Sequence, residues 1–555
     1  MEARRSGNYE ASVWDDDYIQ SIGSPYSGKE YVKQADKLKS HVKIIIDETE
    51  SQLDQLEFID NLQRLHISNH FEDRVKTILK NIYQTIECHE QYTDKDLHVT
   101  ALKFRLLREH GYHVPQEVFC GFTDEFGNFK ACLASDVKGM LSLYEASFLS
   151  VEGEDLLDSA KDFSTHHLRE MVEGIRDSSV AEQVRHALEL PLHWRVQKLE
   201  AKWFINVYES KLDANLILVQ LAKLDFNMVQ VLYQHEIKQL SRWYKETGLA
   251  EKLGFARHRL AECFLWAVGV TPEPQFGFTR EILTKMTVLI TYIDDIYDLY
   301  GTLPELQAFT HAIERWDINE LDNLPEYMRI CFLALFNSAN ELAYHILRDQ
   351  GLNIIPNLRK LWAELSRAYY VEATWFHNGY FPSTNECANT AWISIGGPIA
   401  SFHAYFAISN LIDEKELRVL EQYQGCKRTE QFASAPSQSS ARAARACYRV
   451  DLEHKFWKDE MKKGDIPKSI QCHMHETGCS EEDAREHIKH LIDVNLKRMN
   501  KDIMMEKPVK SFGTTAMNLA RIGLCIYQFG DGFGVPHNET KANLVSLVVK
   551  PIPMP

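Results

Sequence analysis

The chain has little glycine and proline for its length, and it lacks a strongly basic surface. Its 555 residues include only 26 glycines and 17 prolines, which excludes collagen-like and low-complexity classes. The formal net charge is −17, so a general partnership with nucleic acid or an anionic membrane surface is excluded, because polyphosphates attract basic proteins. A polyanionic substrate would have to be met locally, by a metal ion or by clustered arginines.

Paired cysteines and long apolar runs are also missing. The eleven cysteines include no Cys-x-x-Cys pair, which predicts free thiols in a reducing compartment. No run of about 18 apolar residues is evident, and the N-terminal Met-Glu-Ala-Arg-Arg has no apolar secretory segment. These absences predict a soluble intracellular protein without a membrane partner.

The periodicity of apolar residues predicts an all-α protein. Leu53, Leu56, Ile59 and Leu62 follow helical spacing, and strand-like alternation is hard to find. The length suggests more than one domain, and a junction is placed near Asp213. We therefore expect two helical domains, 1–213 and 214–555.

Three carboxylates stand close together in Asp294-Asp295-Ile296-Tyr297-Asp298, at the end of an apolar stretch. On a helix, Asp294 and Asp298 are four residues apart and share a face. Without a cation they would repel each other, and the repulsion would raise their pKa values. Magnesium favours one or two carboxylates together with waters and substrate phosphates, so the pattern predicts a metal site for a phosphorylated ligand. The alternative is a solvated acidic helix end.

An arginine pair precedes the aspartates. Arg257 and Arg259 flank His258, and their guanidinium groups can grip phosphate oxygens. Metal on one side and arginine on the other would stabilise a departing diphosphate, which allows a C–O bond to ionise. The resulting carbocation needs a dry cavity with aromatic walls. Candidate wall residues are plentiful in the second half, although aromatic residues at helical spacing are more often ordinary core. They are Trp266, Tyr292, Tyr369, Tyr370, Trp375, Phe402, Tyr405 and Tyr527.

Several motifs together resemble those of plant class I terpene synthases. They are the Arg-x-Arg pair, the aspartate pentapeptide followed by Leu-Tyr-Gly-Thr, the string from Gly464 to Cys472, and the glycine-rich stretch from Gly530 to Gly534. Arg4 and Arg5, followed after eight intervening residues by Trp14, resemble the tandem-arginine motif of the angiosperm monoterpene synthase subfamily. The match runs nearly end to end.

The resemblance implies a fold and an activity. It implies a vestigial α-barrel-like N-terminal domain and a C-terminal class I terpenoid synthase domain that holds three Mg²⁺ or Mn²⁺ ions. The implied enzyme is a carbon–oxygen lyase that ionises geranyl diphosphate and releases a monoterpene and diphosphate. A sesquiterpene or isoprene synthase on the same scaffold is the alternative. The subfamily implies a plastid location, with a transit peptide expected upstream of Met1.

The resemblance also assigns roles to residues. Asp294, Asp295, Asp298 and Glu460 would serve the metal ions. The substrate would contact Arg257, Arg259, Arg449, Trp266 and Tyr527, together with the metal-bound Asp294 and Asp298. Arg257, Asp294 and Asp298 would be catalytic, and Arg4, Arg5 and Trp14 would form an N-terminal cap over the site.

The second metal motif of the family departs from its pattern. At its positions this chain has Leu452, Glu453, Phe456 and Glu460, and neither leucine nor phenylalanine can ligate a hard cation. The stretch Gly425–Arg449 is rich in serine, alanine and arginine, unlike its surroundings. We expect either a frame or splice change in the transcript or a real segment with fewer metal ligands, which would make the chain a catalytically impaired pseudoenzyme.

Overall fold

The computed structural model describes residues 4, 5, 7, 9, 12–88, 96–409, 412, 467–505, 510–529, 532–533 and 538–554. These residues form helices and their connections, with one isolated β-bridge between Thr123 and Phe129. The predicted all-α fold is confirmed. Arg449, Glu460 and the segment 425–458 lie outside the described residues.

The chain divides into two compact units. The larger unit contains Met1–Gly23, Leu232–Met499 and Pro508–Val545, and the smaller unit contains Ser24–Val231, Asn500–Lys507 and Ser546–Pro555. The border between Val231 and Leu232 falls inside one long helix, α10 (Leu216–Thr247). The domain border expected at residue 213 stays a prediction.

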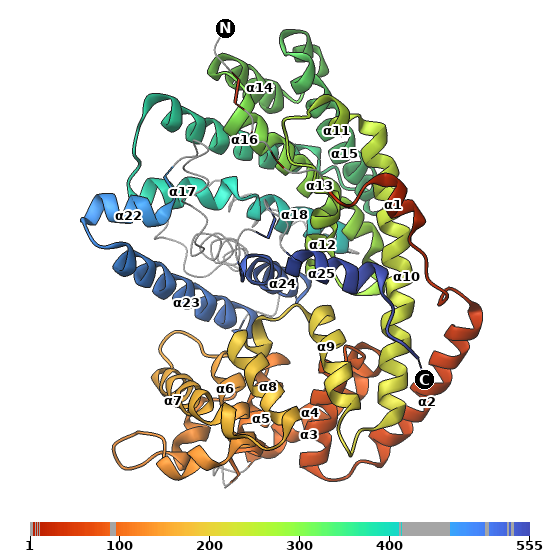
Figure 1. The fold of residues 1–555 in the computed structure, drawn as a ribbon, viewed down its shortest axis with the longest axis vertical. Coiled ribbons are helices and arrows are strands. Elements are labelled where there is room, and N and C mark those ends of the chain that lie inside the picture. Colours follow the sequence, from red (N-terminus) through yellow and green to blue (C-terminus); the bar gives the residue numbers. More distant parts are fainter. Residues whose placement is uncertain are drawn as a thin grey trace. The chain divides into compact units, whose positions relative to one another are not determined.

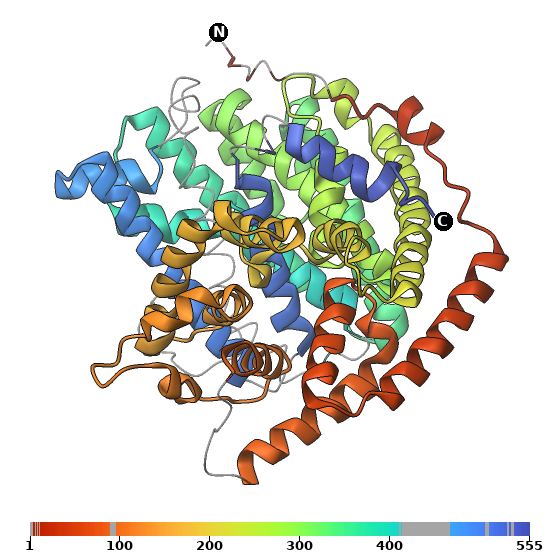
Figure 2. The same ribbon diagram turned by 60° about the horizontal axis from the view of Figure 1, so that its bottom comes forward.

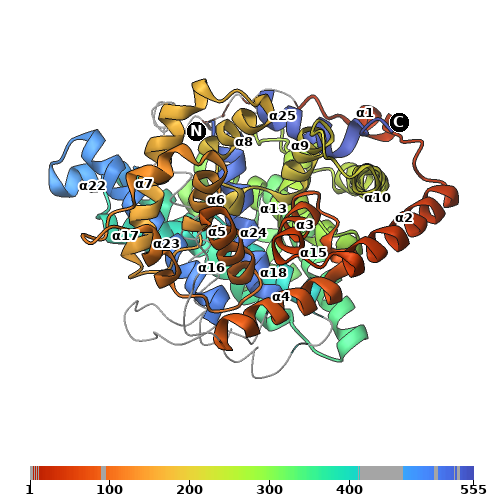
Figure 3. The same cartoon turned by 90° about the horizontal axis from the view of Figure 1, so that it is seen from below.

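The smaller unit is a bundle of amphipathic helices. The predicted period is seen in α3, where Leu56, Ile59 and Leu62 are all buried. Figure 3 shows α5, α6 and α7 side by side, in agreement with their contacts. Its principal helices are α2 (Lys29–Glu48), α3 (Gln52–Arg64), α4 (Glu72–Cys88), α5 (Leu97–Glu109), α6 (Val137–Ser147), α7 (Asp155–Met171), α8 (Ser178–Glu189) and α9 (Gln197–Glu209).

The larger unit is built around α13 (Gly277–Asp295), which carries the first two aspartates at its C-terminal end. This helix is buried on nearly every side, as expected of a helix enclosed by others. Helices α12, α15 and α18 pack against it, and α24 packs on α12 and α18 (Figures 1 and 2). The described helices of this unit include α1 (Asp16–Ser21), α11 (Leu249–Lys252), α12 (Leu260–Val270), α13, α14 (Leu303–Arg315), α15 (Glu326–Gln350), α16 (Ile355–Asn378), α17 (Thr384–Ser394), α18 (Gly397–Ile408), α22 (Ser469–Thr477), α24 (Lys510–Tyr527) and α25 (Asn538–Leu544). The border at Met499 falls inside α23 (Glu481–Met505), most of which belongs to this unit.

Within the described residues, two helices have the length and composition of a membrane span, which the sequence alone did not reveal. They are α10 and α15, whose most apolar 18-residue windows have mean hydropathies of 1.3 and 1.2. Of those windows, 61% and 44% are buried inside the protein. Core helices of soluble proteins have the same properties, so this observation is weak support for a membrane segment.

Candidate active site

The three aspartates differ in their surroundings although they are close in sequence. Asp294 and Asp295 form the end of α13, and Asp298 lies in the π-helical turn Ile296–Tyr300 that follows. A π turn takes in more residues than an α turn, so residues four apart still lie near one another. The side chain of Asp294 is 26% exposed, whereas that of Asp295 is fully buried. Asp298 is partly exposed.

Arg257 binds both aspartates of α13. Its backbone N–H donates to Asp295 Oδ2 at 2.7 Å, its Nε lies 3.0 Å from Asp295 Oδ1, and its Nη2 donates to Asp294 Oδ2. Burial raises the pKa of the Asp294 carboxyl, and Arg257 opposes that rise. The two aspartates hold the pKa of the Arg257 guanidinium well above its usual range, against the effect of burial. The arginine therefore neutralises carboxylates that would otherwise repel each other.

The N-terminal segment contacts the same site. Tyr9 donates its hydroxyl to Asp295 Oδ1 at 3.2 Å, and Arg5 donates to the backbone carbonyl of Asp298. Arg4 forms an ion pair with Glu305 at 2.7 Å. The first two contacts place the tandem-arginine segment directly on the aspartate motif.

Aromatic rings hold the two arginines of this segment. The Arg4 guanidinium lies 4.6 Å from the Tyr300 ring centroid, and that of Arg5 lies 3.9 Å from the Phe376 ring centroid. Such cation–π contacts contribute about 0.5–2 kcal/mol each, depending on exposure. Trp14 has a different place, because it is buried beside Tyr18, immediately before α1. This burial anchors the segment ahead of α1.

The segment before α12 is fixed by a polar network behind the Arg-x-Arg pair. His258 Nδ1 lies 2.7 Å from the Tyr292 hydroxyl and 3.1 Å from the Tyr244 hydroxyl, and the two hydroxyls are 2.5 Å apart. Burial and the neighbouring Arg259 lower the pKa of His258, which favours the neutral form of the ring. Phe255 stacks on Tyr300, with ring centroids 3.8 Å apart. These contacts set the position of Arg257.

The second arginine of the pair has a different partner. Arg259 is buried, and its Nε donates to the carbonyl of Phe533 at 3.1 Å. It thereby reaches the glycine-rich stretch at 530–534, of which 532 and 533 are described. Trp266 on α12 and Tyr527 on α24 meet edge to face, with centroids 6.4 Å apart. The structure therefore joins Trp266 to Tyr527 and Arg257 to the aspartates, as two separate contact sets.

Charged groups that the sequence analysis did not assign also face the aspartates. Glu372 on α16 accepts from the Ser394 hydroxyl at 2.8 Å, and burial raises the pKa of Glu372 to about 8. Lys468 lowers the pKa values of both Glu372 and Asp294. Burial and nearby carboxylates raise the pKa of Tyr369 well above its usual range. The sequence signal for Glu372 was a lone carboxylate between Tyr369 and Trp375 on an aromatic helix face.

The aspartate set fits a hard divalent cation. Asp294 is partly exposed, and its raised pKa reflects burial and repulsion from Asp295, which a nearby cation would relieve. Asp298 presents a second, partly exposed carboxylate on the next turn. Asp295 fits a supporting role, because Arg257 and Tyr9 already occupy its oxygens. Asp294 and Asp298 are thus the residues that would hold the metal.

Comparison with known proteins identifies the family. The family model "Terpene synthase family, metal binding domain" matches residues 245–498, and "Terpene synthase, N-terminal domain" matches residues 13–188. The chain belongs to the plant class I terpene synthases. It is 63% identical to the trans-alpha-bergamotene synthase of Phyla dulcis, over 100% of this chain and 99% of that protein. It is 60% identical to the exo-alpha-bergamotene synthase of Lavandula angustifolia, over the full length of both.

Solved structures confirm the fold and the cofactor of this terpene synthase. A limonene synthase with 2-fluorolinalyl diphosphate superposes with a TM-score of 0.93 at 39% identity, over 99% of this chain and 100% of that one. The isoprene synthase of grey poplar, with three Mg²⁺ ions and dimethylallyl-S-thiolodiphosphate, superposes with a TM-score of 0.87 at 42% identity, over 98% and 99% of the two chains. The enzyme is a metal-dependent carbon–oxygen lyase that acts on a prenyl diphosphate, as predicted.

Proposed function

We propose that this terpene synthase ionises farnesyl diphosphate and releases a sesquiterpene. The observation that carries the proposal is the ranking of relatives. Sesquiterpene synthases stand first, namely the two bergamotene synthases at 63% and 60% identity and the alpha-zingiberene synthase of Ocimum basilicum at 57%. A monoterpene synthase, the (-)-alpha-terpineol synthase of Vitis vinifera, follows at 50%. This reverses the preference for geranyl diphosphate that the sequence motifs favoured.

In the proposed reaction the allylic C–O bond breaks heterolytically, and diphosphate leaves with the electron pair. The carbocation rearranges and loses a proton to give a sesquiterpene hydrocarbon. When bound, divalent metal supplies positive charge that stabilises the departing diphosphate. Arg257 would contribute a guanidinium to the same diphosphate, while Asp295 holds Arg257 by its backbone N–H and Nε.

The other assignments are proposals of the same kind. Asp294 and Asp298 would hold the metal, Arg259 would contact the substrate, and catalysis would lie within 214–555. Trp266 and Tyr527 would bound the hydrocarbon chain, since aromatic faces stabilise a carbocation without attacking it. Arg4 and Arg5 would cover the site, which excludes water from the cation.

A monoterpene synthase is the second candidate. The tandem arginines and Trp14 favour it, and so does the TM-score of 0.93 with limonene synthase. The two candidates differ in the length of the prenyl chain that the site accepts. The plastid location expected from the sequence has no specific support among these relatives and stays a prediction.

The test is a comparison of C5, C10 and C15 prenyl diphosphates with the purified chain and Mg²⁺, with volatile products analysed by gas chromatography and mass spectrometry. A kcat/KM for farnesyl diphosphate about tenfold above that for geranyl diphosphate, a difference of about 1.4 kcal/mol in the barrier, would support the proposal. A preference for geranyl diphosphate would overturn it in favour of the monoterpene synthase. EDTA is expected to abolish turnover, and silence with all three substrates would support the pseudoenzyme alternative.

A further inference from the structure

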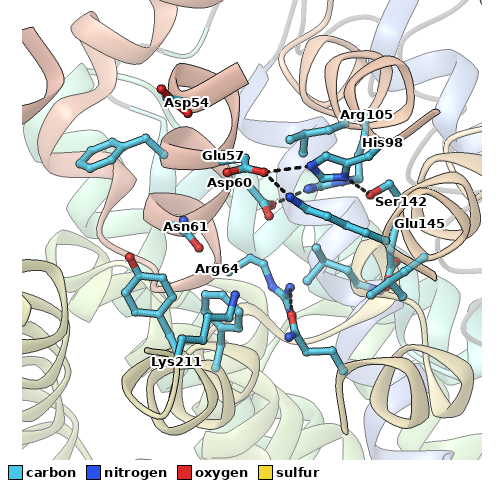
Figure 4. Close-up of a pocket in the computed structure, with 18 of the residues that line it drawn as sticks. Asp54, Glu57, Asp60, Asn61, Arg64, His98, Arg105, Ser142, Glu145 and Lys211 are labelled. Carbon is cyan, nitrogen blue, oxygen red and sulfur yellow. Dashed lines mark hydrogen bonds and ion pairs between the residues drawn. The ribbon is translucent and has the colours of Figure 1, made fainter. Parts of the chain in front are cut away.

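The smaller unit contains a pocket of about 400 Å³ that the aspartate chemistry does not use. It lies among α3, α5, α6, α8 and α9 and the segment that follows α9 (Figure 4). Its volume falls in the range of small-molecule sites, about 300–1,000 Å³. All its lining residues lie in 24–231, so it is separate from the active site described above.

Most of the charged side chains that line this pocket are satisfied by ion pairs. Glu57 Oε1 accepts from Lys138 at 2.5 Å and from His98 at 3.1 Å. Arg105 forms an ion pair with Asp60, and Arg64 forms one with Glu200 at 2.9 Å. Because of these ion pairs, few charged side chains of the lining remain available to bind a ligand.

Lys211 is the inner cation without a carboxylate. Among the described residues no acidic oxygen lies within 4.0 Å of its ammonium, which instead lies 5.7 and 5.6 Å from the ring centroids of Phe204 and Tyr208. Burial and the nearby Arg64 lower the pKa of Lys211. Lys211 is half-buried, and an anionic group bound there would give its ammonium the partner of opposite charge that it lacks.

Glu145 is the inner carboxyl without a cation. Its Oε2 accepts from the Leu192 backbone N–H at 2.8 Å, and no ammonium or guanidinium in the described part of the chain lies within ion-pair distance. Burial raises the pKa of Glu145 to about 7. Lys211 therefore lacks an anionic partner and Glu145 a cationic one, and a cation beside Glu145 would favour its ionised form. In Figure 4 Lys211 lies at the lower left and Glu145 at the right, so the pocket separates the two groups.

The balance of charges selects the class of ligand. The lining residues include five carboxyls and four basic side chains, namely Asp54, Glu57, Asp60, Glu145 and Asp213 against Arg64, Arg105, Lys138 and Lys211. A ligand with only a negative charge would be repelled by the excess of carboxyls, and a ligand with only a positive charge would leave Lys211 unpaired. A molecule with one charge of each sign satisfies both groups. Apolar lining is supplied by Phe58, Leu102 and Leu141.

We propose that this pocket binds a small zwitterion, an amino acid or dipeptide with an apolar side chain, whose carboxylate faces Lys211 and whose ammonium faces Glu145. The side chain of the ligand would lie against the apolar lining. The site is independent of the prenyl diphosphate and of the metal.

The test is isothermal titration of the full chain with glycyl-L-phenylalanine, without metal or prenyl diphosphate. The one-charge analogues 3-phenylpropionate and 2-phenylethylamine are the ligand controls. Lys211→Met and Glu145→Gln are each expected to weaken dipeptide binding by about tenfold, or about 1.4 kcal/mol. Lys43→Met, a substitution of an exposed lysine on α2 outside the pocket, is the matched control and should bind as the unaltered chain does.

Three results would overturn the proposal. They are no binding of the dipeptide at millimolar concentration, binding of either one-charge analogue as tight as that of the dipeptide, and unchanged binding in Lys211→Met. Circular dichroism and terpene synthase turnover check that each variant is folded, since none of the substituted residues belongs to the aspartate site. Because the titration needs no turnover, its failure is distinguishable from failure of the proposed function.

Discussion

Replacing Asp295 by asparagine tests whether this residue supports the site or binds metal. The carboxylate of Asp295 is fully buried and accepts from the Arg257 backbone N–H, from Arg257 Nε and from the Tyr9 hydroxyl. Asparagine keeps one acceptor oxygen but turns an NH₂ group toward these donors. Removal of one partner of a buried ion pair costs about 3–5 kcal/mol, because the remaining charge is left uncompensated.

The assay is thermal unfolding in EDTA, so that metal binding does not contribute. For domains of 150–250 residues, a loss of 1 kcal/mol in the free energy of unfolding lowers Tm by about 2–4 °C. The larger unit should lie at the low end of that range. We therefore expect Asp295→Asn to lower Tm by about 6–10 °C. Activity should fall as well, because Arg257 loses its support.

Asp298→Asn is the matched control. Asp298 is partly exposed, so its substitution should cost less than about 1 kcal/mol of stability while turnover is lost. If Asp295→Asn melts within about 2 °C of the unaltered chain, its free energy of unfolding has changed by less than about 1 kcal/mol, and Asp295 does not support the site. An equal fall in Tm for both variants would refute the reasoning too, because the two carboxylates would then have the same role.

Three further substitutions test other parts of the structure. Tyr9→Phe removes one hydrogen bond and should cost about 1 kcal/mol and reduce kcat several-fold in a steady-state assay; an unchanged kcat would contradict a role of the N-terminal segment in the site. The raised pKa of Glu372, about 8, means that the folded chain keeps a proton that the unfolded chain releases near pH 4.5, so stability falls as pH rises between these values. Glu372→Gln should flatten that fall in thermal melts recorded in EDTA, and an identical pH profile would contradict the burial argument. Gly269→Ala would bring a methyl group within 2.6 Å of Ile522 and should cost about 1–3 kcal/mol by overpacking, whereas Gly254→Ala, with no atom within 4 Å, should melt normally.

The sequence predicted the helices well because their apolar faces are local patterns. The spacing of Leu56, Ile59 and Leu62 predicts the buried face of α3, and all three are buried. The aspartate cluster and the Arg-x-Arg pair were also visible, because each is contiguous in the chain. Their direct contact through Arg257 was not, because it depends on how α12 and α13 pack.

Long-range contacts explain most of what the sequence could not reveal. Arg5 binds the carbonyl of Asp298, 293 residues away, and no local pattern specifies such a pairing. Glu372 and Lys468 influence Asp294 from two other elements, and neither carries a motif that reveals this. The sequence also treats the three aspartates alike. The structure separates them: at the end of α13 the side chain of Asp295 is buried and that of Asp294 is partly exposed, and Asp298 lies in the π turn that follows.

This separation gives Arg257 two kinds of attachment. Its backbone N–H and Nε are held by Asp295, which is buried and fixed, while Nη2 reaches the partly exposed Asp294. Arg257 Nη2 can therefore leave Asp294 without giving up either contact to Asp295. Once the carboxylate of Asp294 is engaged elsewhere, the freed end of the guanidinium is an unsatisfied donor at the edge of the site, and a diphosphate oxygen is the acceptor that suits it best. Under the proposed role of Arg257, Asp294 would be its exchangeable partner, and Asp295 would be the permanent partner that keeps the arginine in place for the leaving group.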